Sequence, residues 1–197
     1  RLVSRSMQMT LLFSFAVTAV FWEFSTELGQ AFYHDGSAAE LLRILSPLVP
    51  LLYLDGIVDS ILKGLDQQVS SLKYNFSDSA IRVVLVWFLV PLWGVRGYLC
   101  ILFFSTIFNA ALSIHRLLVV SEVRLNFSDW ILKPALCAAF AAAVARLSQY
   151  LPLLSQVPSP ILICLQLLVA CVLYSLALRA CGSLSRSDID WLRSLFH

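Results

Sequence analysis

Ionisable side chains at helical spacing are the residues of this chain that are best placed to do chemistry. Glu23 and Glu27 are four residues apart, as are Asp55 and Asp59, so the members of each pair would share one face of a helix. Two carboxylates on one face can bind a cation or line a water-filled cavity. The structural alternative is that Glu23 bonds a neighbour and that Glu27 and Asp59 reach solvated helix ends. Asp55 lies deeper in its apolar segment.

A basic residue stands in a similar position. Arg82 follows Asp78 by one turn in the middle of an apolar segment, and an acidic residue four places before a basic one is the favourable order for an ion pair. At 1.5 Å per residue, antiparallel helices bring Asp55 to a similar depth. We therefore predict a cluster of Asp55, Asp78 and Arg82 with Arg82 at its centre. It would be either a charge-neutralising structural network or a site for an ion or an anionic headgroup beside a wet cavity.

The same residues do not predict an enzyme. The Asp55-x-x-x-Asp59 spacing resembles the aspartate-rich motifs of magnesium-dependent membrane transferases, but residues 51–54 add no carboxylate for a magnesium cage. The chain has no HExxH, GxSxG, P-loop or GxGxxG motif. Its five cysteines form no CxxC motif and are interpreted as small packing residues. We expect no catalytic residue, no metal site and no cofactor.

The composition defines the surroundings of these groups. Of the 197 residues, 59% are hydrophobic and 13% are charged, and the mean hydropathy is +0.83. A soluble domain of this length cannot bury such an excess, and a disordered chain would not contain it. The net charge of +2 is small and its basic residues are dispersed, which excludes a nucleic-acid partner. The composition predicts a polytopic membrane protein in contact with membrane lipids.

Six apolar segments are long enough, or nearly so, to cross a bilayer as helices. They are residues 9–28, 41–62, 73–92, 98–120, 130–151 and 161–181. The sequence therefore predicts an all-α fold with six transmembrane helices. Pro47 and Pro50 should kink the second helix, and Gly94 and Gly97 should form a tight turn between the third and fourth. The alanine-rich run 137–145 should permit close helix packing.

The distribution of basic residues predicts the orientation. Of the fourteen Lys and Arg residues, only Arg43, Arg96 and Arg146 fall on one side of a six-span arrangement. The other side is therefore expected to be cytoplasmic and to hold both termini. The chain begins at Arg1 without a signal peptide, from which we expect it to be a fragment that lacks an upstream part.

Four stretches in order carry a family resemblance over about residues 5–146. They are LLRILSPLVPLLYLDGIVDSILKGLDQQ at 41–68, LVPLWGVRGY at 89–98, LSIHRLL at 112–118 and DWILKPAL at 129–136. They resemble the C-terminal half of stage V sporulation protein B and related polysaccharide exporters, which belong to the multidrug/oligosaccharidyl-lipid/polysaccharide flippase superfamily. The helix end "giLqGlgq" of that pattern is matched from Ile61 to Gln67.

The resemblance implies a two-lobe transporter of about fourteen helices in the bacterial cytoplasmic membrane. Its central cavity would alternate across the membrane and carry a lipid-linked saccharide of the polyprenyl-pyrophosphate type. Residues 1–151 would form the last four helices of the second lobe and the first accessory helix. Residues 152–182 would form the final transmembrane helix, and residues 183–197 a short cytoplasmic amphipathic tail. The missing first lobe of the same protein would be the main partner, and Arg82 or Asp55 would border the cavity.

Two other functions fit the residues. A drug or metabolite exporter of the same superfamily would share the fold but have a smaller, more aromatic cavity. A non-transporting membrane scaffold is the alternative if the chain is complete. Charged groups that face a wet cavity would favour transport, whereas groups that sit dry between helices would favour the scaffold.

Overall fold

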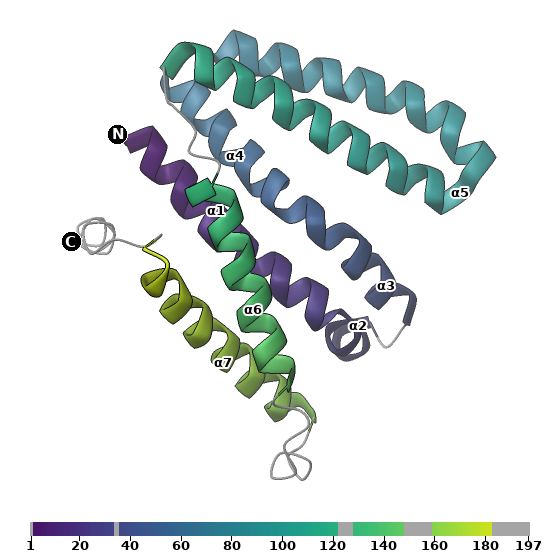
Figure 1. Cartoon of the computed structure of the whole chain (residues 1–197). Helices are drawn as coiled ribbons and strands as arrows, with labels where there is room; N and C mark the ends of the chain where they lie inside the picture. The colour runs from purple at the N-terminus through teal and green to yellow at the C-terminus, as the bar shows by residue number, and fades with distance from the viewer. Residues whose placement is uncertain (1, 34–35, 122–127, 148–158, 183–197) are drawn as a thin grey trace. The chain divides into compact units, whose positions relative to one another are not determined.

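The computed structural model describes residues 2–33, 36–121, 128–147 and 159–182, and these are almost entirely helical (Figure 1). The predicted tail 183–197 and most of the connection before the last helix lie outside the described residues. In chain order the elements are α1 (Leu2–Glu23), α2 (Ser25–Tyr33), α3 (Gly36–Leu45), the 3-10 helix η1 (Ser46–Leu48), α4 (Val49–Gly64), α5 (Gln68–Ser121), the π-helical turn η2 (Ser128–Leu132), α6 (Lys133–Leu147) and α7 (Ser159–Ala180).

Among the residues that the structure describes, three helical stretches are long and apolar enough to cross a membrane. They are Gly36–Gly64, Gln68–Ser121 and Ser128–Leu147, while Cys164–Ala180 is a shorter apolar helix. The predicted first segment, 9–28, is divided between two helices because the chain bends at Phe24. Near this bend the Ser25 hydroxyl donates to the Trp22 carbonyl, a side-chain bond that competes with regular helix. The prediction that Glu23 and Glu27 share one helix is therefore wrong.

The helix that follows is interrupted where the prolines predicted a kink. Pro47 lies in η1, between α3 and α4, and the Ser46 hydroxyl donates to the Arg43 carbonyl at 2.9 Å. Pro50 follows at the second residue of α4. Because proline has no N–H to donate, a short 3-10 turn here costs few helical bonds.

The chain forms two compact units, one of residues 1–10 and 50–124, the other of residues 11–49 and 125–197. In the first unit, α5 is a hairpin of two helical limbs, residues 68–93 and 95–121 (Figure 1). Gly94 makes the turn with φ 56° and ψ −134°, a conformation that is accessible essentially only to glycine. At Gly97 a Cβ atom would lie 2.6 Å from the Leu89 carbonyl oxygen, so the limbs start in close contact.

This hairpin buries polar residues and exposes apolar ones, which is the opposite of the arrangement in a soluble protein. Six of the ten buried residues of α5 are polar, namely Ser71, Asp78, Ser105, Thr106, Asn109 and Ser113. The outward positions are large and apolar, and Phe76, Trp87 and Leu92 are each 73–76% exposed. Such a distribution is typical of helices that turn their apolar side to lipid and their polar groups to one another.

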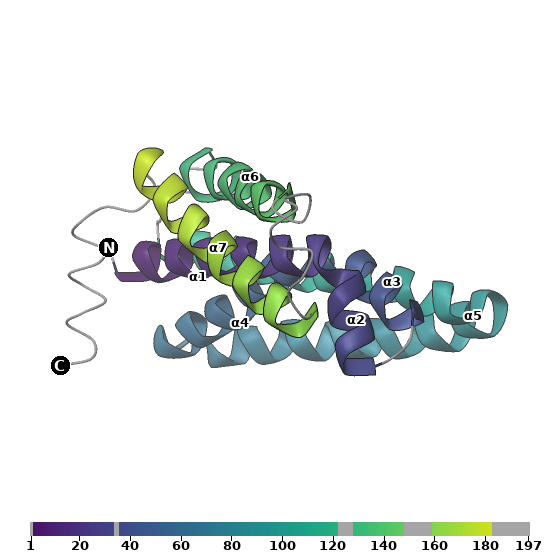
Figure 2. The same ribbon diagram turned by 90° about the horizontal axis from the view of Figure 1, so that it is seen from below.

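In the second unit α6 and α7 lie side by side (Figure 2). One face of α6 is buried through Cys137, Ala138, Ala141, Ala142 and Ala145, while Ala139 and Ala143 on the other face are exposed. Small residues thus line the helix contact, as the alanine-rich run predicted. The Tyr174 hydroxyl of α7 donates to the Leu12 carbonyl of α1 at 2.7 Å, which fixes the position of α7 along its neighbour.

Candidate functional site: polar groups inside the α5 hairpin

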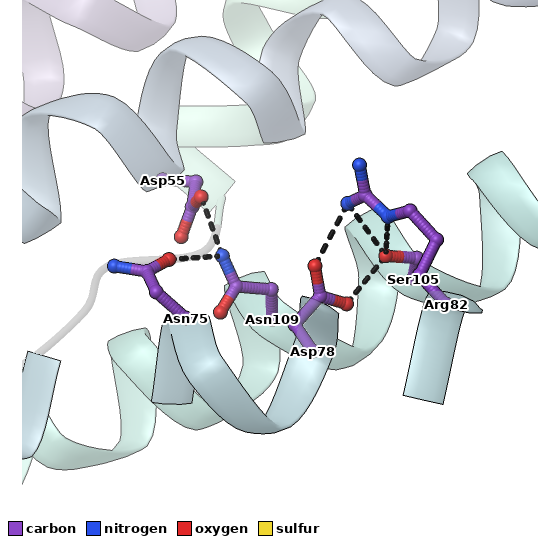
Figure 3. A network of polar contacts seen from close by, with 6 residues as sticks. All are labelled: Asp55, Asn75, Asp78, Arg82, Ser105 and Asn109. Atoms are coloured by element: carbon purple, nitrogen blue, oxygen red, sulfur yellow. Dashed lines mark hydrogen bonds and ion pairs between the residues drawn. The ribbon is translucent and has the colours of Figure 1, made fainter. Parts of the chain in front are cut away.

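The hairpin brings residues of its two limbs together in antiparallel register. Positions at similar distances from Gly94 meet, so Arg82 contacts Ser105 and Asn75 contacts Asn109. The bonded polar side chains between the limbs, and those of α4 beside them, form the candidate site (Figure 3). All of its residues belong to the first compact unit.

The predicted ion pair between Asp78 and Arg82 is present. Arg82 Nη2 lies 2.7 Å from Asp78 Oδ2 and also donates to the Ser105 hydroxyl at 2.7 Å. Arg82 Nε donates to the same hydroxyl at 3.0 Å, and this hydroxyl donates to Asp78 Oδ1. The three residues thus form a closed ring of hydrogen bonds, which we call the Arg82 ring.

The members of the Arg82 ring differ in exposure. Ser105 is fully buried and the Asp78 side chain is 7% exposed, whereas the Arg82 side chain is 43% exposed. Arg82 Nη1 points away from Asp78 and Ser105 and has no hydrogen-bond partner among the described residues (Figure 3). The guanidinium is therefore held on one edge and open on the other.

The predicted cluster is confirmed for Asp78 and Arg82. Asp55 forms no ion pair with Arg82, although Asp78 of the ring lies within electrostatic range of Asp55. Asp55 Oδ2 accepts a hydrogen bond from Asn109 Nδ2 at 2.8 Å, and the same nitrogen donates to Asn75 Oδ1 at 3.3 Å. The reason is the register of the hairpin, which places Asn109 and not Arg82 opposite this turn of α4 (Figure 3).

The Asp55 carboxylate has a free oxygen. Asp55 Oδ1 is buried and has no hydrogen-bond partner in the described part of the chain, and the same holds for Asn109 Oδ1. No cation forms an ion pair with Asp55 there, and the neighbouring charges of Asp59 and Asp78 are negative. Asp55 is thus a half-buried carboxylate whose close partners, Asn109 and Ser113, are both neutral.

Asp59 lies near the end of α4, where the sequence predicted it, and its side chain is 23% exposed. It forms an ion pair with Lys63 at 2.6 Å, and the Lys63 side chain is 58% exposed. The hydroxyl of Ser71 also donates to Asp59, and Asn75 Nδ2 lies 3.4 Å from it. These contacts anchor the end of α4 to the beginning of the first limb.

The two glutamates lie in the second unit and do not act as a pair. Arg146 Nη1 lies 3.3 Å from the Glu23 carboxylate and also bonds the Glu23 carbonyl. Glu27 lies in the first turn of α2, and its Oε2 is buried without a hydrogen-bond partner among residues that the structure describes. Glu23 thus bonds a neighbour, whereas Glu27 is half-buried with one of its two carboxylate oxygens sheltered.

The described surroundings of these groups include a groove and no metal-binding cluster. Within residues 2–33, 36–121, 128–147 and 159–182, no group of three or more His, Cys, Asp or Glu side chains could hold a metal ion. The first unit has an open, mostly apolar groove of about 520 Å³ between the start of α1 and α4, lined by Thr10, Leu52, Tyr53, Gly56, Ile57 and Ser60. The groove contains none of the charged residues of the candidate site.

Ser105 and Asn75 are the partners that sequence reasoning missed. Ser105 lies on one face of the second limb with Asn109 and Ser113, at a spacing of four residues. That polar stripe, opposite Asp78 across a turn at Gly94, could have identified Ser105 from the sequence alone.

Comparison with family models, curated proteins and solved structures gave no match for this chain.

Proposed function

We propose that this chain is part of a bacterial cytoplasmic-membrane transporter that moves a lipid-linked saccharide across the bilayer by alternating access. The proposal combines the resemblance to polysaccharide exporters with a hairpin that is polar inside and apolar outside. The six predicted spans and the cytoplasmic termini belong to the same proposal, since the basic residues are distributed so unevenly. Reporter fusions at both ends and at residue 96 test that topology.

The open edge of Arg82 is the observation that carries the proposal. Asp78 and Ser105 hold Nε and Nη2, so the guanidinium needs no reorganisation before it binds an anion at Nη1. A polyprenyl pyrophosphate is an anion that must leave the aqueous phase while its lipid tail stays in the bilayer. An arginine in the middle of a membrane helix matches this requirement, because its planar donors suit phosphate oxygens.

Asp55 supplies a group for ion coupling. Its unbonded Oδ1 can take up a proton or contact a monovalent cation together with the free Asn109 oxygen. Neutralising Asp55 changes the net charge between α4 and the second limb, and a transporter can use such a change to bias one orientation of its cavity. Coupling through Asp55 and phosphate binding at Arg82 are separate roles of neighbouring groups.

The decisive experiment measures flipping of a fluorescent polyprenyl-pyrophosphate saccharide in proteoliposomes. The protein is expressed from the complete reading frame that contains this chain, and quencher accessibility from outside reports the flipped fraction. Loss of a charged hydrogen bond of about 1.5–3 kcal/mol predicts that Arg82→Gln slows flipping by roughly 10- to 100-fold. Arg116→Gln is the matched control, because Arg116 bonds Gln67 and not the ring.

The outcomes separate the candidate functions. Slow flipping with Arg82→Gln and normal flipping with Arg116→Gln support the proposal. Equal rates for Arg82→Gln and wild type, with both proteins folded, refute the role of Arg82. If a small lipophilic drug is carried in place of the saccharide, the exporter alternative replaces the proposal.

A non-transporting membrane scaffold is a second candidate function, and the closed bonding of the Arg82 ring favours it. Most of the polar groups in the hairpin bond one another, as they would in a network that only joins helices. In that case Asp55→Asn has no effect other than a small change in stability. If Asp55 couples transport, Asp55→Asn leaves the protein folded and abolishes the response of flipping to a pH or Na⁺ gradient.

A further inference from the structure

Two thiols on different helices of the second unit face each other. Cys137 Sγ, near the start of α6, lies 3.5 Å from Sγ of Cys181, which directly follows α7. Cys137 is buried and Cys181 is exposed, so one sulfur is sheltered and the other is accessible. The other three cysteines of the chain, Cys100, Cys164 and Cys171, are all exposed.

The approach of the two thiols is fixed by the surrounding helices. Cys181 is held by a helical bond from its N–H to the Ala177 carbonyl at 2.9 Å, and Gly182 ends the helix with φ 69°. Two turns earlier, the Tyr174 hydroxyl donates to the Leu12 carbonyl and sets the position of α7 along α1. Cys137 belongs to the small-residue face of α6 that packs closely in this unit. The pair is therefore a property of the packing and not of a loose chain end.

The two sulfurs differ in their access to a soluble oxidant. Cys181 is exposed, whereas Cys137 is buried in the small-residue face of α6. Thiol–disulfide exchange requires that the attacking thiol can reach the oxidant. Cys181 is thus suited to react first and Cys137 to resolve.

We propose that Cys137 and Cys181 are a redox-responsive dithiol that closes to a disulfide and locks the end of α7 to the start of α6. To reach a disulfide length of about 2 Å the sulfurs need to move by only about 1.5 Å. This inference rests on the helix packing of the second unit and is independent of the proposed transport function.

The reaction is an exchange with a low-molecular-weight disulfide such as oxidised glutathione. The Cys181 thiolate attacks one sulfur of the oxidant, forms a mixed disulfide and releases one small thiolate. Cys137 then loses its proton to water and attacks the Cys181 sulfur, which expels the second small thiolate. The protein dithiol is oxidised by two electrons, the small disulfide is reduced to two thiols, and the two protein protons end on them. A reducing thiol reverses both steps.

Thiol counting on the full chain in its membrane tests the proposal. Membranes are equilibrated with oxidised glutathione, blocked in acid, denatured and labelled with a maleimide polymer that shifts the band once per free thiol. We expect five labelled thiols before oxidation and three afterwards, with recovery of all five in dithiothreitol. Peptide mass spectrometry should find one cross-linked species, which joins the peptides that contain Cys137 and Cys181.

Matched variants and a second readout complete the test. Cys181→Ser should label four thiols with and without oxidant, whereas the control Cys171→Ser should fall from four to two. Oxidation should raise the thermal midpoint of the wild-type protein by about 5–15 °C, because the cross-link constrains the unfolded chain. The proposal is wrong if all five thiols stay free when a reference dithiol is fully oxidised, or if another cysteine pair is found. Both results are measured on the wild-type protein, so they decide the proposal even if a variant fails to fold.

Discussion

Replacing Arg82 should destabilise the chain more than replacing its partner Asp78, because the two residues differ in burial. In Arg82→Gln the Asp78 carboxylate stays 7% exposed and keeps only the Ser105 hydroxyl as a donor. In Asp78→Asn the Arg82 guanidinium keeps its contacts with Ser105, and its 43% exposed side chain can still reach water or headgroups. The first change leaves a buried charge unpaired, and the second does not.

The magnitude follows from the exposure of the pair. Breaking a fully buried ion pair costs about 3–5 kcal/mol, and an exposed pair contributes about 0–1 kcal/mol. Since Arg82 is partly exposed, we expect a loss of about 2–3 kcal/mol for Arg82→Gln and about 1 kcal/mol for Asp78→Asn. The double variant should lose less than the sum of the two single losses, because it leaves no unpaired charge.

Equilibrium unfolding in mixed micelles with increasing dodecyl sulfate, followed by tryptophan fluorescence, measures these free energies. Lys63→Gln is the control, since Lys63 and Asp59 form an i,i+4 pair like Asp78 and Arg82 but Lys63 is 58% exposed. That variant should lose less than 1 kcal/mol. Additive losses in the double variant, or equal losses for Arg82→Gln and Asp78→Asn, would refute the burial argument.

Four further substitutions test the backbone and the core in the same unfolding assay. Gly97→Ala should lose about 1–3 kcal/mol because its Cβ would meet the Leu89 carbonyl, whereas Gly56→Ala, with open space around it, should gain about 0.5–1 kcal/mol; a loss in both would contradict this. Asp66→Gly should gain about 1 kcal/mol, because residue 66 has φ 61° in the turn after α4, and no gain would mean that this turn is unstrained. Gln166→Leu should gain about 1–3 kcal/mol, since both polar side-chain atoms of Gln166 are buried and unpartnered among the described residues, and a loss would reveal a partner.

Local signals in the sequence predicted the parts of the fold that depend on backbone chemistry. Proline at position 47 has no N–H and glycine at position 94 adopts a conformation closed to other residues, so each marks a break in the helix. The turn after α4 also depends on a backbone conformation that favours one residue type. Gln67 N–H bonds the Leu62 carbonyl and Asp66 N–H bonds the Lys63 carbonyl, the pattern of a helix end that favours glycine at position 66. The family pattern quoted above has glycine there, and this chain has aspartate.

The partners of the charged residues could not be predicted in the same way. Asp78 and Arg82 are neighbours on one helix, so their pairing follows from spacing alone. The partner of Asp55 depends on how α4 faces the hairpin, and a rotation by one residue would have exchanged Asn109 for another side chain. The bend at Phe24 could not be predicted either, because no proline or glycine stands near it in the sequence. The bend is also slight in its bonding, since the helical bonds from Phe24 N–H to the Val20 carbonyl and from Leu28 N–H to the Phe24 carbonyl continue through it.

The charges of the candidate site distinguish the two candidate functions. Asp59 is paired with Lys63 and Asp78 with Arg82, so these four charges cancel, and Asp55 remains as a carboxylate whose bonded partner is neutral. A charged group at bilayer depth costs about 2.5–3.5 kcal/mol on insertion scales, and an amide at position 55 would make a similar contact with Asn109 without that cost. A network that only joins helices gains no stability from an unpaired carboxylate at this position. Alternating access does, because its cycle needs one group whose charge changes when a proton or cation arrives. The surplus carboxylate therefore supports transport over scaffolding, and it does so independently of what Arg82 binds.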